Sequence, residues 1–543
     1  MRRIELLAVV GAFVATCACG SQEAPGGAGR GGSAAGNAGS AGQSVGETAR
    51  AGSAGLAGAA GSGALAGAAG AAASVGAAGA LELGSGGANV GGQGGTAGGP
   101  VLALPLLVTS ALGAYWQTDG QLQEASSEAA EVTIEDGTLA QLWQGFGGTF
   151  SERAGDYFSQ LSAADRAWAL QLLFGRDGLR FGYGRIPIGA SDYAIDRYSL
   201  DETAGDFEMS QFSVERDKQK LIPYIQAVLG VAPHIHLWAS PWSPPTWMKE
   251  NAAFDGGNMK EDDATLHAFA LYLTRFVQEY GKLGIPIEVI HPQKEPNLAL
   301  DFPSCVWSPA GMTKLIGTHL GPMFAEQKVG AQIFLGSLSE DDHGGRSQAI
   351  IDAVTSDPNG MSYVKGFGFE WEGLNLVAAV RAKNLPIWQD NHNVGNLPWG
   401  SPFSASTAPN DHAYAVTSWG FVRDWIKAGV NAYFTSNMIL DAVGNGIGAK
   451  AWPQNALLVV DSSKKLLLTP AFHVFRHIAG FVEPGAHVVG TRGGDALAFK
   501  NPDGSIVVVL FNSGAAKQTV LELGQKKLKF AVPENGWATV VSK

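Results

Sequence analysis

Cysteine is scarce in this sequence, with three among 543 residues. Cys17 and Cys19 lie close to the amino terminus, so that Cys305 is the only cysteine in the remainder of the chain. One cysteine can form neither an intrachain disulfide nor a zinc site built from several thiolates. The sequence therefore excludes a disulfide framework and a cysteine-based zinc site.

Basic residues are also few, because 37 Lys and Arg stand against 49 Asp and Glu, which gives a net charge of -12 at pH 7. No run of consecutive basic residues is longer than two. Proteins that bind nucleic acid neutralise phosphates with such residues, so nucleic acid is not expected as a partner. The region predicted to fold also lacks the motifs of a P-loop, a zincin or a nucleophile elbow.

No apolar run is long enough to cross a bilayer as a helix. Residues 6–14 form a short apolar stretch shortly after Arg2-Arg3, which predicts that residues 1–19 are an export signal peptide. Cys17 or Cys19 at its end could accept a lipid, so secretion and lipid anchoring both stay open. We expect an exported protein that is secreted or lipid-anchored at a bacterial cell surface, without a transmembrane span.

Residues 20–100 consist almost entirely of Gly, Ala and Ser. Such a segment cannot bury enough apolar surface to offset the entropy that ordering costs. We therefore predict a disordered linker that holds the following domains away from the cell surface.

Residues 141–484 alternate between short apolar runs typical of strands and longer stretches typical of helices. Eight strands separated by helices predict an α/β fold, a (β/α)8 TIM barrel. A doubly wound sheet is the alternative, but its dinucleotide-binding form needs a glycine fingerprint that residues 145–148 do not match. The expected strands are 144–150, 179–187, 234–239, 287–295, 332–335, 363–371, 385–391 and 431–440. The expected helices are 162–175, 213–229, 263–280, 348–354, 376–383, 413–428 and 469–482, and another begins at Ser308-Pro309.

Residues 485–543 contain only short strands separated by Gly, Asn and Pro, which predicts a small β-sandwich. Strands are expected at 496–499, 505–512, 519–523 and 537–541. Residues 101–140 are expected to supply amino-terminal strands that pack on this sandwich.

Residues 287–297 carry the feature on which the functional hypothesis depends. An apolar strand ends there at Glu295, and Pro296 follows directly. Because barrel enzymes place their chemistry at the carboxyl ends of strands, this acid is a candidate catalytic residue. Tryptophan rings stack on sugars and carboxylates bind hydroxyl groups, so the residues at the other strand ends favour a carbohydrate ligand. These residues are Arg185, Asp192, Trp242, Glu370, Trp371, Asn391 and Asn437.

Four motifs occur in the predicted barrel: Gln144-Gly145-Phe146-Gly147-Gly148, Gly184-Arg185-Ile186-Pro187-Ile188-Gly189, Ala239-Ser240-Pro241-Trp242-Ser243-Pro244-Pro245-Thr246-Trp247-Met248-Lys249 and Gln293-Lys294-Glu295-Pro296. They resemble the motifs of glycoside hydrolase family 30, which includes glucosylceramidases and microbial β-1,6-glucanases, and they occur in the family's order. The resemblance extends from about Leu107 to Lys543. It implies a barrel with a β-sandwich side domain, a β-linked substrate, and no metal or organic cofactor.

Members of that family hydrolyse with retention and use two glutamates, one as acid/base and one as nucleophile. The resemblance puts Glu295 on the acid/base position and Asn391 on the nucleophile position, where an amide is not competent. Lys294 stands where the family usually has Asn, and Ser436 stands where it has Trp. Glu370 occupies a position that is often His or Gln.

Three explanations of Asn391 stay open. In the first, another carboxylate replaces the nucleophile: Glu370, as the base of an inverting reaction, is favoured over Asp390, which should point to the opposite face of its strand. In the second, the protein is a catalytically impaired carbohydrate-binding relative at the cell surface. In the third, Lys294 and Asn391 serve a changed substrate or a transglycosylation. A purely structural surface protein is a further alternative.

The favoured hypothesis is an O-glycosyl hydrolase of β-linked glucosides or glucans, with Glu295 as general acid/base and with activity impaired by the missing nucleophile. The expected partner is a β-linked oligosaccharide, polysaccharide or glycoside. Glucosylceramide as the substrate rests on the resemblance alone. The residues expected to bind substrate are Arg185, Asp192, Trp242, Lys294, Trp371 and Asn437.

Overall fold

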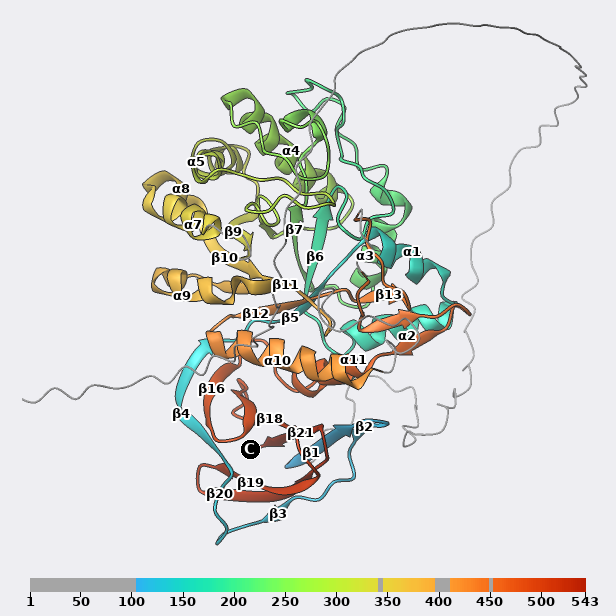
Figure 1. The fold of residues 1–543 in the computed structure, drawn as a ribbon, viewed down its shortest axis with the longest axis vertical. Helices are drawn as coiled ribbons and strands as arrows, with labels where there is room; N and C mark the ends of the chain where they lie inside the picture. The colour runs from blue at the N-terminus through green and yellow to red at the C-terminus, as the bar shows by residue number, and fades with distance from the viewer. Residues whose placement is uncertain (1–103, 340–344, 396–410, 449–452) are drawn as a thin grey trace, which may run out of the picture. The chain divides into compact units, whose positions relative to one another are not determined.

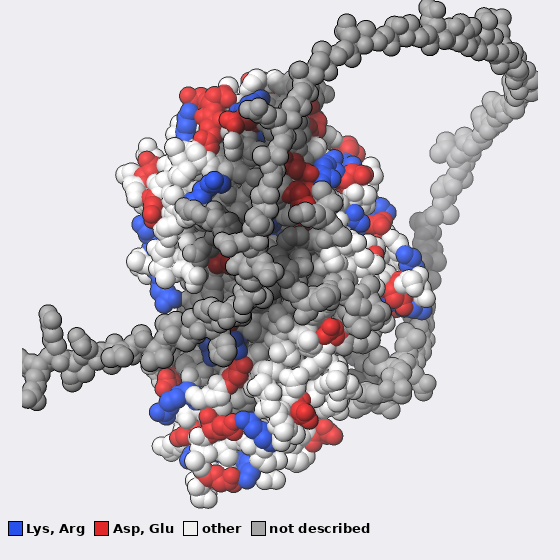
Figure 2. Space-filling model, in the orientation of Figure 1, with Lys and Arg blue, Asp and Glu red and all other residues white. Residues whose placement is uncertain are grey.

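The computed structural model describes residues 104–339, 345–395, 411–448 and 453–543. The predicted signal peptide and the whole of the predicted linker lie outside the described residues. Among the described residues, no helix is both long enough and apolar enough to cross a membrane. Figure 2 shows acidic and basic side chains interspersed over the visible face of the molecule rather than gathered by sign.

Eight parallel strands close into a barrel, which confirms the predicted (β/α)8 fold (Figure 1). They pair in chain order, and β12 returns to β5 to complete the ring. The barrel strands are β5 (Gly145–Thr149), β6 (Tyr183–Ile188), β7 (His236–Pro241), β8 (Val289–Ile290), β9 (Gln332–Leu338), β10 (Val364–Glu370), β11 (Ile387–Asn393) and β12 (Ala432–Ser436).

Helix boundaries follow local capping signals in the sequence. Ser162 caps α2 by accepting a hydrogen bond from the Asp165 N–H, and the helix ends at Gly175 as predicted. Ser308 caps α5, whose first residue is Pro309. The α-helices are α1 (Glu152–Gln160), α2 (Ala163–Phe174), α3 (Leu221–Leu229), α4 (Asp263–Lys282), α5 (Pro309–Lys314), α6 (Gly321–Glu326), α7 (Arg346–Ser356), α8 (Pro358–Tyr363), α9 (Val377–Val380), α10 (His412–Ala428) and α11 (Pro470–Ala479). Short 3-10 helices are η1 (Asp217–Gln219), η2 (Thr246–Met248), η4 (Trp371–Leu376) and η5 (Arg381–Lys383), and η3 (Leu315–Leu320) is a π-helix.

Two predicted elements are shorter than expected. The helix predicted at 213–229 begins only at Leu221, because the preceding segment is held separately by Asp217, which accepts hydrogen bonds from two buried tyrosine hydroxyls. The strand predicted at 287–295 is reduced to the two residues of β8. Pro292 has no N–H to continue the ladder, so the chain leaves the regular strand before Glu295.

The second domain is a ten-stranded sheet made from both ends of the folded chain. Strand β1 lies between β2 and β21 and pairs antiparallel with both, so residues before the barrel contribute strands to this sheet. Two strands of the sheet, β16 and β20, were not predicted. The sheet strands are β1 (Leu106–Ala111), β2 (Ala114–Gln117), β3 (Gln123–Glu124), β4 (Val132–Leu142), β16 (His487–Arg492), β17 (Asp495–Lys500), β18 (Ile506–Asn512), β19 (Lys517–Leu523), β20 (Lys526–Val532) and β21 (Gly536–Ser542). A separate small sheet contains β13 (Ile439–Asp441), β14 (Leu458–Val460) and β15 (Leu466–Leu468).

Helix α11 contacts strand β21 and so joins the two domains. His477 of this helix is fully buried, and its ring is bonded on both sides. Nδ1 lies 2.7 Å from Thr539 Oγ1, and Nε2 lies 2.8 Å from Ser110 Oγ. Burial lowers the pKa of His477 to about 3, so the ring is neutral in the native state at ordinary pH.

The barrel interior has an aromatic layer toward the amino ends of its strands. Trp238, Phe334, Trp388 and Phe434 pack there as one buried cluster. Side chains nearer the carboxyl ends of the same strands are charged or polar, and the candidate site lies among them.

Candidate active site

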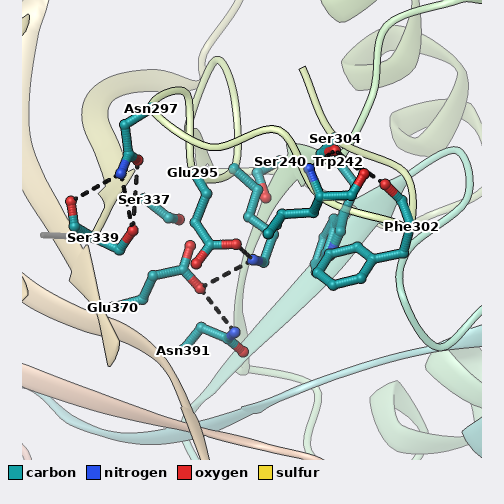
Figure 3. A network of polar contacts seen from close by, with 12 residues as sticks. Ser240, Trp242, Glu295, Asn297, Phe302, Ser304, Ser337, Ser339, Glu370 and Asn391 are labelled. Atoms are coloured by element: carbon teal, nitrogen blue, oxygen red, sulfur yellow. Dashed lines mark hydrogen bonds and ion pairs between the residues drawn. The ribbon is translucent and has the colours of Figure 1, made fainter. Parts of the chain in front are cut away.

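Residues from four parts of the barrel meet at the carboxyl ends of the strands (Figure 3). Arg185 comes from β6, Glu370 is the last residue of β10, and Asn391 lies in β11. Lys294 and Glu295 lie in the segment that follows β8. Figure 3 shows the carboxyl groups of Glu295 and Glu370 turned toward one another, with Asn391 beside Glu370. The sequence-predicted catalytic residues are therefore brought together.

The segment after β8 is fixed by its backbone rather than by strand pairing. The Lys294 N–H donates to the Pro241 carbonyl at the end of β7, and the Glu295 N–H donates to the Ser337 carbonyl of β9, each at 2.9 Å. Glu295 has a φ of +43°, a left-handed conformation that residues with a Cβ adopt at a cost of about 1 kcal/mol or more. These contacts fix the backbone from which the Glu295 side chain faces Glu370 (Figure 3).

Lys294 links the two glutamates. Its ammonium group hydrogen-bonds Glu295 Oε2 and lies 3.6 Å from Glu370 Oε2. Both partners are buried, with Glu295 6 % exposed and Glu370 fully enclosed. A charge-assisted contact in such a site is screened little by water.

One carboxylate oxygen of Glu370 has a hydrogen-bond partner, and the other has none among the described residues. Oε2 accepts a hydrogen bond of 2.8 Å from Asn391 Nδ2, and Arg185 Nη1 lies 4.0 Å from it. Oε1 is buried and has no hydrogen-bond partner among the described residues. Burial raises the pKa of Glu370 well above its usual range, although Lys294 and Arg185 act in the opposite direction.

A β-bulge in β11 brings Asn391 to Glu370. Phe369 pairs with Gln389, but the next residue, Glu370, pairs with Asn391, so Asp390 is an extra residue in the ladder. Asp390 was expected to point to the opposite strand face unless the register changed, and the bulge is that change. Its carboxylate Oδ2 lies in the barrel interior, 3.1 Å from Nδ1 of the buried His291.

The buried cations Arg185 and Lys294 share the site with the buried carboxyl groups of Glu295, Glu370 and Asp390, and the partly exposed Asp192 adds a fourth carboxyl group. Burial raises the pKa of Asp192, while Lys294 and Arg185 oppose that shift. Burial alone would lower the pKa of Lys294, but Glu295, Glu370 and Asp192 outweigh it and raise the value. The acidic groups therefore outnumber the basic ones.

Arg185 is positioned by several side chains at once. Its Nη2 donates to Ser240 Oγ at 2.8 Å, and its guanidinium lies over the Trp242 ring at 4.3 Å. Trp242 is 1 % exposed, so the ring face that meets Arg185 is not open to a sugar. Ser240 and Ser337 were missed as contributors; the predicted strand at 332–335 stopped two residues before Ser337, which β9 includes.

The remaining predicted residues lie around this centre. Asn437, which follows β12, is fully buried; its Nδ2 donates to Gln454 Oε1 at 3.4 Å, and its Oδ1 has no partner among the described residues. Trp371 follows Glu370 with a φ of +48° and is partly exposed beside His392, with ring centroids 5.4 Å apart. Within the described ranges, no group of three or more His, Cys, Asp or Glu could hold a metal ion.

Two family models match consecutive parts of the chain. One, described as the glycosyl hydrolase family 30 TIM-barrel domain, matches residues 143–482, and the other, the family's beta sandwich domain, matches residues 485–540. The chain belongs to glycoside hydrolase family 30. The predicted fold, a barrel with a β-sandwich side domain, and the resemblance based on the four motifs are thereby confirmed.

Relatives of this family 30 chain include proteins named as glucosylceramidases and as endo-1,6-beta-D-glucanases. Putative glucosylceramidase 1 of Caenorhabditis elegans is 28% identical over 415 residues, covering 72% of this chain and 77% of the relative. Lysosomal acid glucosylceramidase of Mus musculus is 26% identical, covering 70% and 77%. Endo-1,6-beta-D-glucanase neg1 of Aspergillus fumigatus is 24% identical, covering 72% and 82%.

Solved structures agree on the fold of this family 30 chain. The crystal structure of SrfJ from Salmonella typhimurium has a TM-score of 0.72 at 22% identity and covers 81% of this chain and 99% of its own. An endo-beta1,6-glucanase has a TM-score of 0.67 at 21% identity with the same coverage. At these identities the similarity shows the barrel and its β-rich companion domain, and nothing further.

Proposed function

We propose that this family 30 protein hydrolyses β-linked glucosides or glucans, with Glu295 and Glu370 as its two catalytic carboxylates. The observation that carries the proposal is the pair of carboxyl groups that face each other across Lys294 at the mouth of the barrel. Hydrolysis of a glycosidic bond needs two such groups, and Asn391 cannot supply one.

The separation of the two carboxylates favours a retaining reaction. Lys294 Nζ lies 3.6 Å from Glu370 Oε2 and hydrogen-bonds Glu295 Oε2. If that hydrogen bond spans about 3 Å, the two oxygens are at most about 6.6 Å apart. Retaining enzymes hold their carboxyl groups at about 5–5.5 Å and inverting ones at about 6.5–9.5 Å. The nearest oxygens thus fall below most of the inverting range, which argues against the inverting role first considered for Glu370.

The substrate class rests on the names of the relatives, which are glucosylceramidases and endo-1,6-β-glucanases. The head group common to both classes is a β-linked glucose. A buried arginine and two unpartnered amide oxygens, on Asn391 and Asn437, are groups that sugar hydroxyls could bond.

The test is turnover of β-1,6-glucan and aryl β-glucosides by the full chain. Glu295→Gln should lower kcat/KM by about a thousandfold or more, because loss of a catalytic group costs several orders of magnitude. Glu288→Gln is the matched control, since Glu288 is half exposed and pairs with His236 instead of contacting the cluster. Absence of turnover by the wild type on every substrate would contradict the proposal.

The second candidate function is carbohydrate binding without catalysis, which is favoured by the amide at position 391. It predicts a silent wild type that binds β-glucans measurably by calorimetry. In that case Asn391→Glu should restore hydrolysis if the barrel is otherwise complete.

We also propose export to a bacterial cell surface, supported by the sequence of residues 1–19. Fractionation of the producing cells should recover the protein outside the cytoplasm. A Cys19→Ala variant that leaves the membrane fraction for the medium would distinguish lipid anchoring from secretion.

A further inference from the structure

A second cavity lies at the end of the barrel opposite the candidate active site. Arg185 and Glu370 lie toward the carboxyl ends of β6 and β10, whereas this cavity is lined by residues at the amino ends of the strands. Its volume is about 330 Å³. Trp238, Phe334 and Trp388 of the buried aromatic layer form its floor. The proposed hydrolysis involves none of the residues that line it.

Tyr183, the first residue of β6, forms one wall of the cavity. Its ring packs against the aromatic layer, with ring centroids 5.7 Å from Trp388, and lies over Gly145, where a Cβ would come within 3.2 Å of the ring. Burial, and then the charge of Glu288, raise the pKa of Tyr183 to about 12, so the hydroxyl keeps its proton at ordinary pH. That hydroxyl has no hydrogen-bond partner among the described residues and is able to donate to a ligand.

Three further polar groups of the cavity lack partners among the described residues. Gln144 is held through its Oε1, which accepts a hydrogen bond of 2.6 Å from Trp388 Nε1, so its Nε2 stays available to donate. The N–H of Trp238 is buried and unpaired, and the side-chain amide of Gln332, the first residue of β9, makes no hydrogen bond. Donors therefore predominate, and a ligand with several acceptor oxygens would pair them.

The charges around the cavity disfavour ions. All of its lining residues are described, and none of them is Lys or Arg. Glu288 at the rim is half exposed, and its Oε2 lies 2.8 Å from His236 Nδ1. An anion would meet this carboxylate without a cation to offset it. A cation would accept no hydrogen bond from Gln144, Tyr183 or Trp238.

A neutral sugar ring matches this combination of groups. Its hydroxyls both accept and donate hydrogen bonds, and its C–H faces are apolar, as is the aromatic floor of the cavity. Cavities that bind small ligands measure about 300–1,000 Å³, and this one lies at the lower end of that range. It therefore admits one ring rather than a length of polysaccharide.

We propose that this cavity is a second carbohydrate site, which binds one neutral pyranose unit at the amino ends of the barrel strands. The ring lies over Trp388 and Phe334, and its hydroxyl oxygens accept hydrogen bonds from Gln144 Nε2 and the Tyr183 hydroxyl. The site is independent of the proposed hydrolysis, because it lies at the opposite end of the barrel. The protein thereby holds a terminal sugar of a glycan away from the catalytic carboxylates.

Photo-crosslinking tests where a sugar binds. Methyl α-glucoside, α-galactoside and α-mannoside, each carrying a diazirine, are irradiated with the full chain, and peptide mass spectrometry locates the label. The α-anomers are used because the proposed hydrolysis acts on β linkages and does not consume them. We expect labels from at least one sugar at Tyr183, at residues 236–238 or at residues 386–388, reduced by the unmodified glycoside. Labels confined to the carboxyl-end loops of the barrel, or no label, would overturn the proposal.

The concentration dependence of labelling at these residues measures the affinity of this cavity alone. Tyr183→Phe removes only the hydroxyl and should weaken the affinity by about three- to tenfold. Tyr363→Phe is the matched control, because Tyr363 is also partly buried but lies in α8, outside the cavity, and it should leave the affinity unchanged. Equal affinities of the wild type and a folded Tyr183→Phe variant would overturn the proposal. Thermal unfolding shows whether each variant is folded.

Two charged probes test the class of ligand. Tetramethylammonium and inorganic phosphate should not reduce labelling of the cavity, and displacement of the sugar by either at a lower concentration than by the methyl glycoside would overturn the assignment to carbohydrate. The result is distinguishable from that of the proposed function. Turnover of β-glucosides depends on the carboxyl-end cluster, so a wild type without turnover that still labels at the cavity contradicts the hydrolysis and supports the second site.

Discussion

The molecule contains two buried polar clusters that differ in how completely their atoms are paired. Where the domains meet, both ring nitrogens of His477 have partners, on Thr539 and Ser110. At the mouth of the barrel, Glu370 Oε1 and Asn391 Oδ1 have none among the described residues, and acidic groups exceed basic ones. Full pairing holds two domains together, and incomplete pairing leaves atoms free to meet a ligand.

The difference also separates stability from activity. Where every buried polar atom has a hydrogen-bond partner, removal of one partner destabilises the protein. A buried cluster with surplus charge is already costly, so removing the surplus costs little or is stabilising. Substitutions in the two clusters should therefore move different measurements.

The largest expected effect is the pH dependence of the domain boundary. Burial lowers the pKa of His473 and of His477 to about 3, against about 6.5 in an unfolded chain. Below pH 6.5 each histidine binds a proton in the unfolded state but stays neutral in the native state. The free energy of unfolding should therefore fall by about 3 kcal/mol per histidine by pH 4. Urea unfolding from pH 7 to 4 measures this. His477→Gln should remove about 3 kcal/mol of the fall in the free energy of unfolding, and the exposed His234→Gln should remove none. A profile without any fall toward pH 4 would contradict this explanation.

The next effect is loss of the cation that the two glutamates share. Lys294→Met should cost about 3 kcal/mol at pH 8, because breaking a buried pair leaves carboxylate charge uncompensated. At pH 5 the cost should shrink, since the carboxyl groups can then take protons. Lys314→Met, which removes a pair at the surface with Asp263, should cost under about 1 kcal/mol at both values. A cost for Lys294→Met that does not change with pH would argue against the surplus of acidic groups.

A smaller effect is expected at the fully paired cluster. Ser110→Ala leaves His477 Nε2 buried without a partner, which should cost about 1–3 kcal/mol in urea unfolding. Ser159→Ala, on the exposed side of α1, should change stability by less than about 0.5 kcal/mol. Equal values for the two variants would remove the contrast between the clusters.

The smallest stability effect should come from Glu370→Gln. The amide keeps the shape of the side chain and removes one of the surplus acidic groups, so the free energy of unfolding should be unchanged or raised by about 1 kcal/mol. Hydrolysis of β-glucosides should nevertheless fall steeply, because Glu370 is one of the two proposed catalytic carboxylates. Destabilisation by several kcal/mol would show that Glu370 serves the fold rather than the reaction.

Most of the barrel could be predicted from the alternation of apolar strands and capped helices. Ser162 and Gly175 bound α2 as their chemistry requires, and all eight strands occur where apolar runs do. Strand β8 was overestimated because an apolar run also describes a buried segment that bonds to its neighbours without ladder pairing. Strands β16 and β20 were missed because polar residues alternate into them, as in His487–Arg492.

The sequence could predict which residues form the site but not which of them contact one another. Strand ends identify which side chains meet, so Arg185, Glu295 and Glu370 were found from the sequence. The bulge at Asp390 was not, because it depends on the pairing register with β10 and not on the local residues. Likewise, the proximity of Lys294 to both glutamates depends on the left-handed turn at Glu295.

The pairing of β1 with β21 has a consequence for synthesis. These strands come from nearly opposite ends of the folded chain, and β4 of the early segment pairs with both β16 and β19. During synthesis all the barrel strands leave the ribosome before β21, so until then β1 lacks its partner β21. Contacts this distant in sequence form slowly and leave strand edges exposed meanwhile. The second domain is therefore assembled last, after all the strands of the barrel have been synthesised. Truncation within β21 should leave the barrel able to fold but expose the unpaired edges of its neighbours, and the protein should then aggregate.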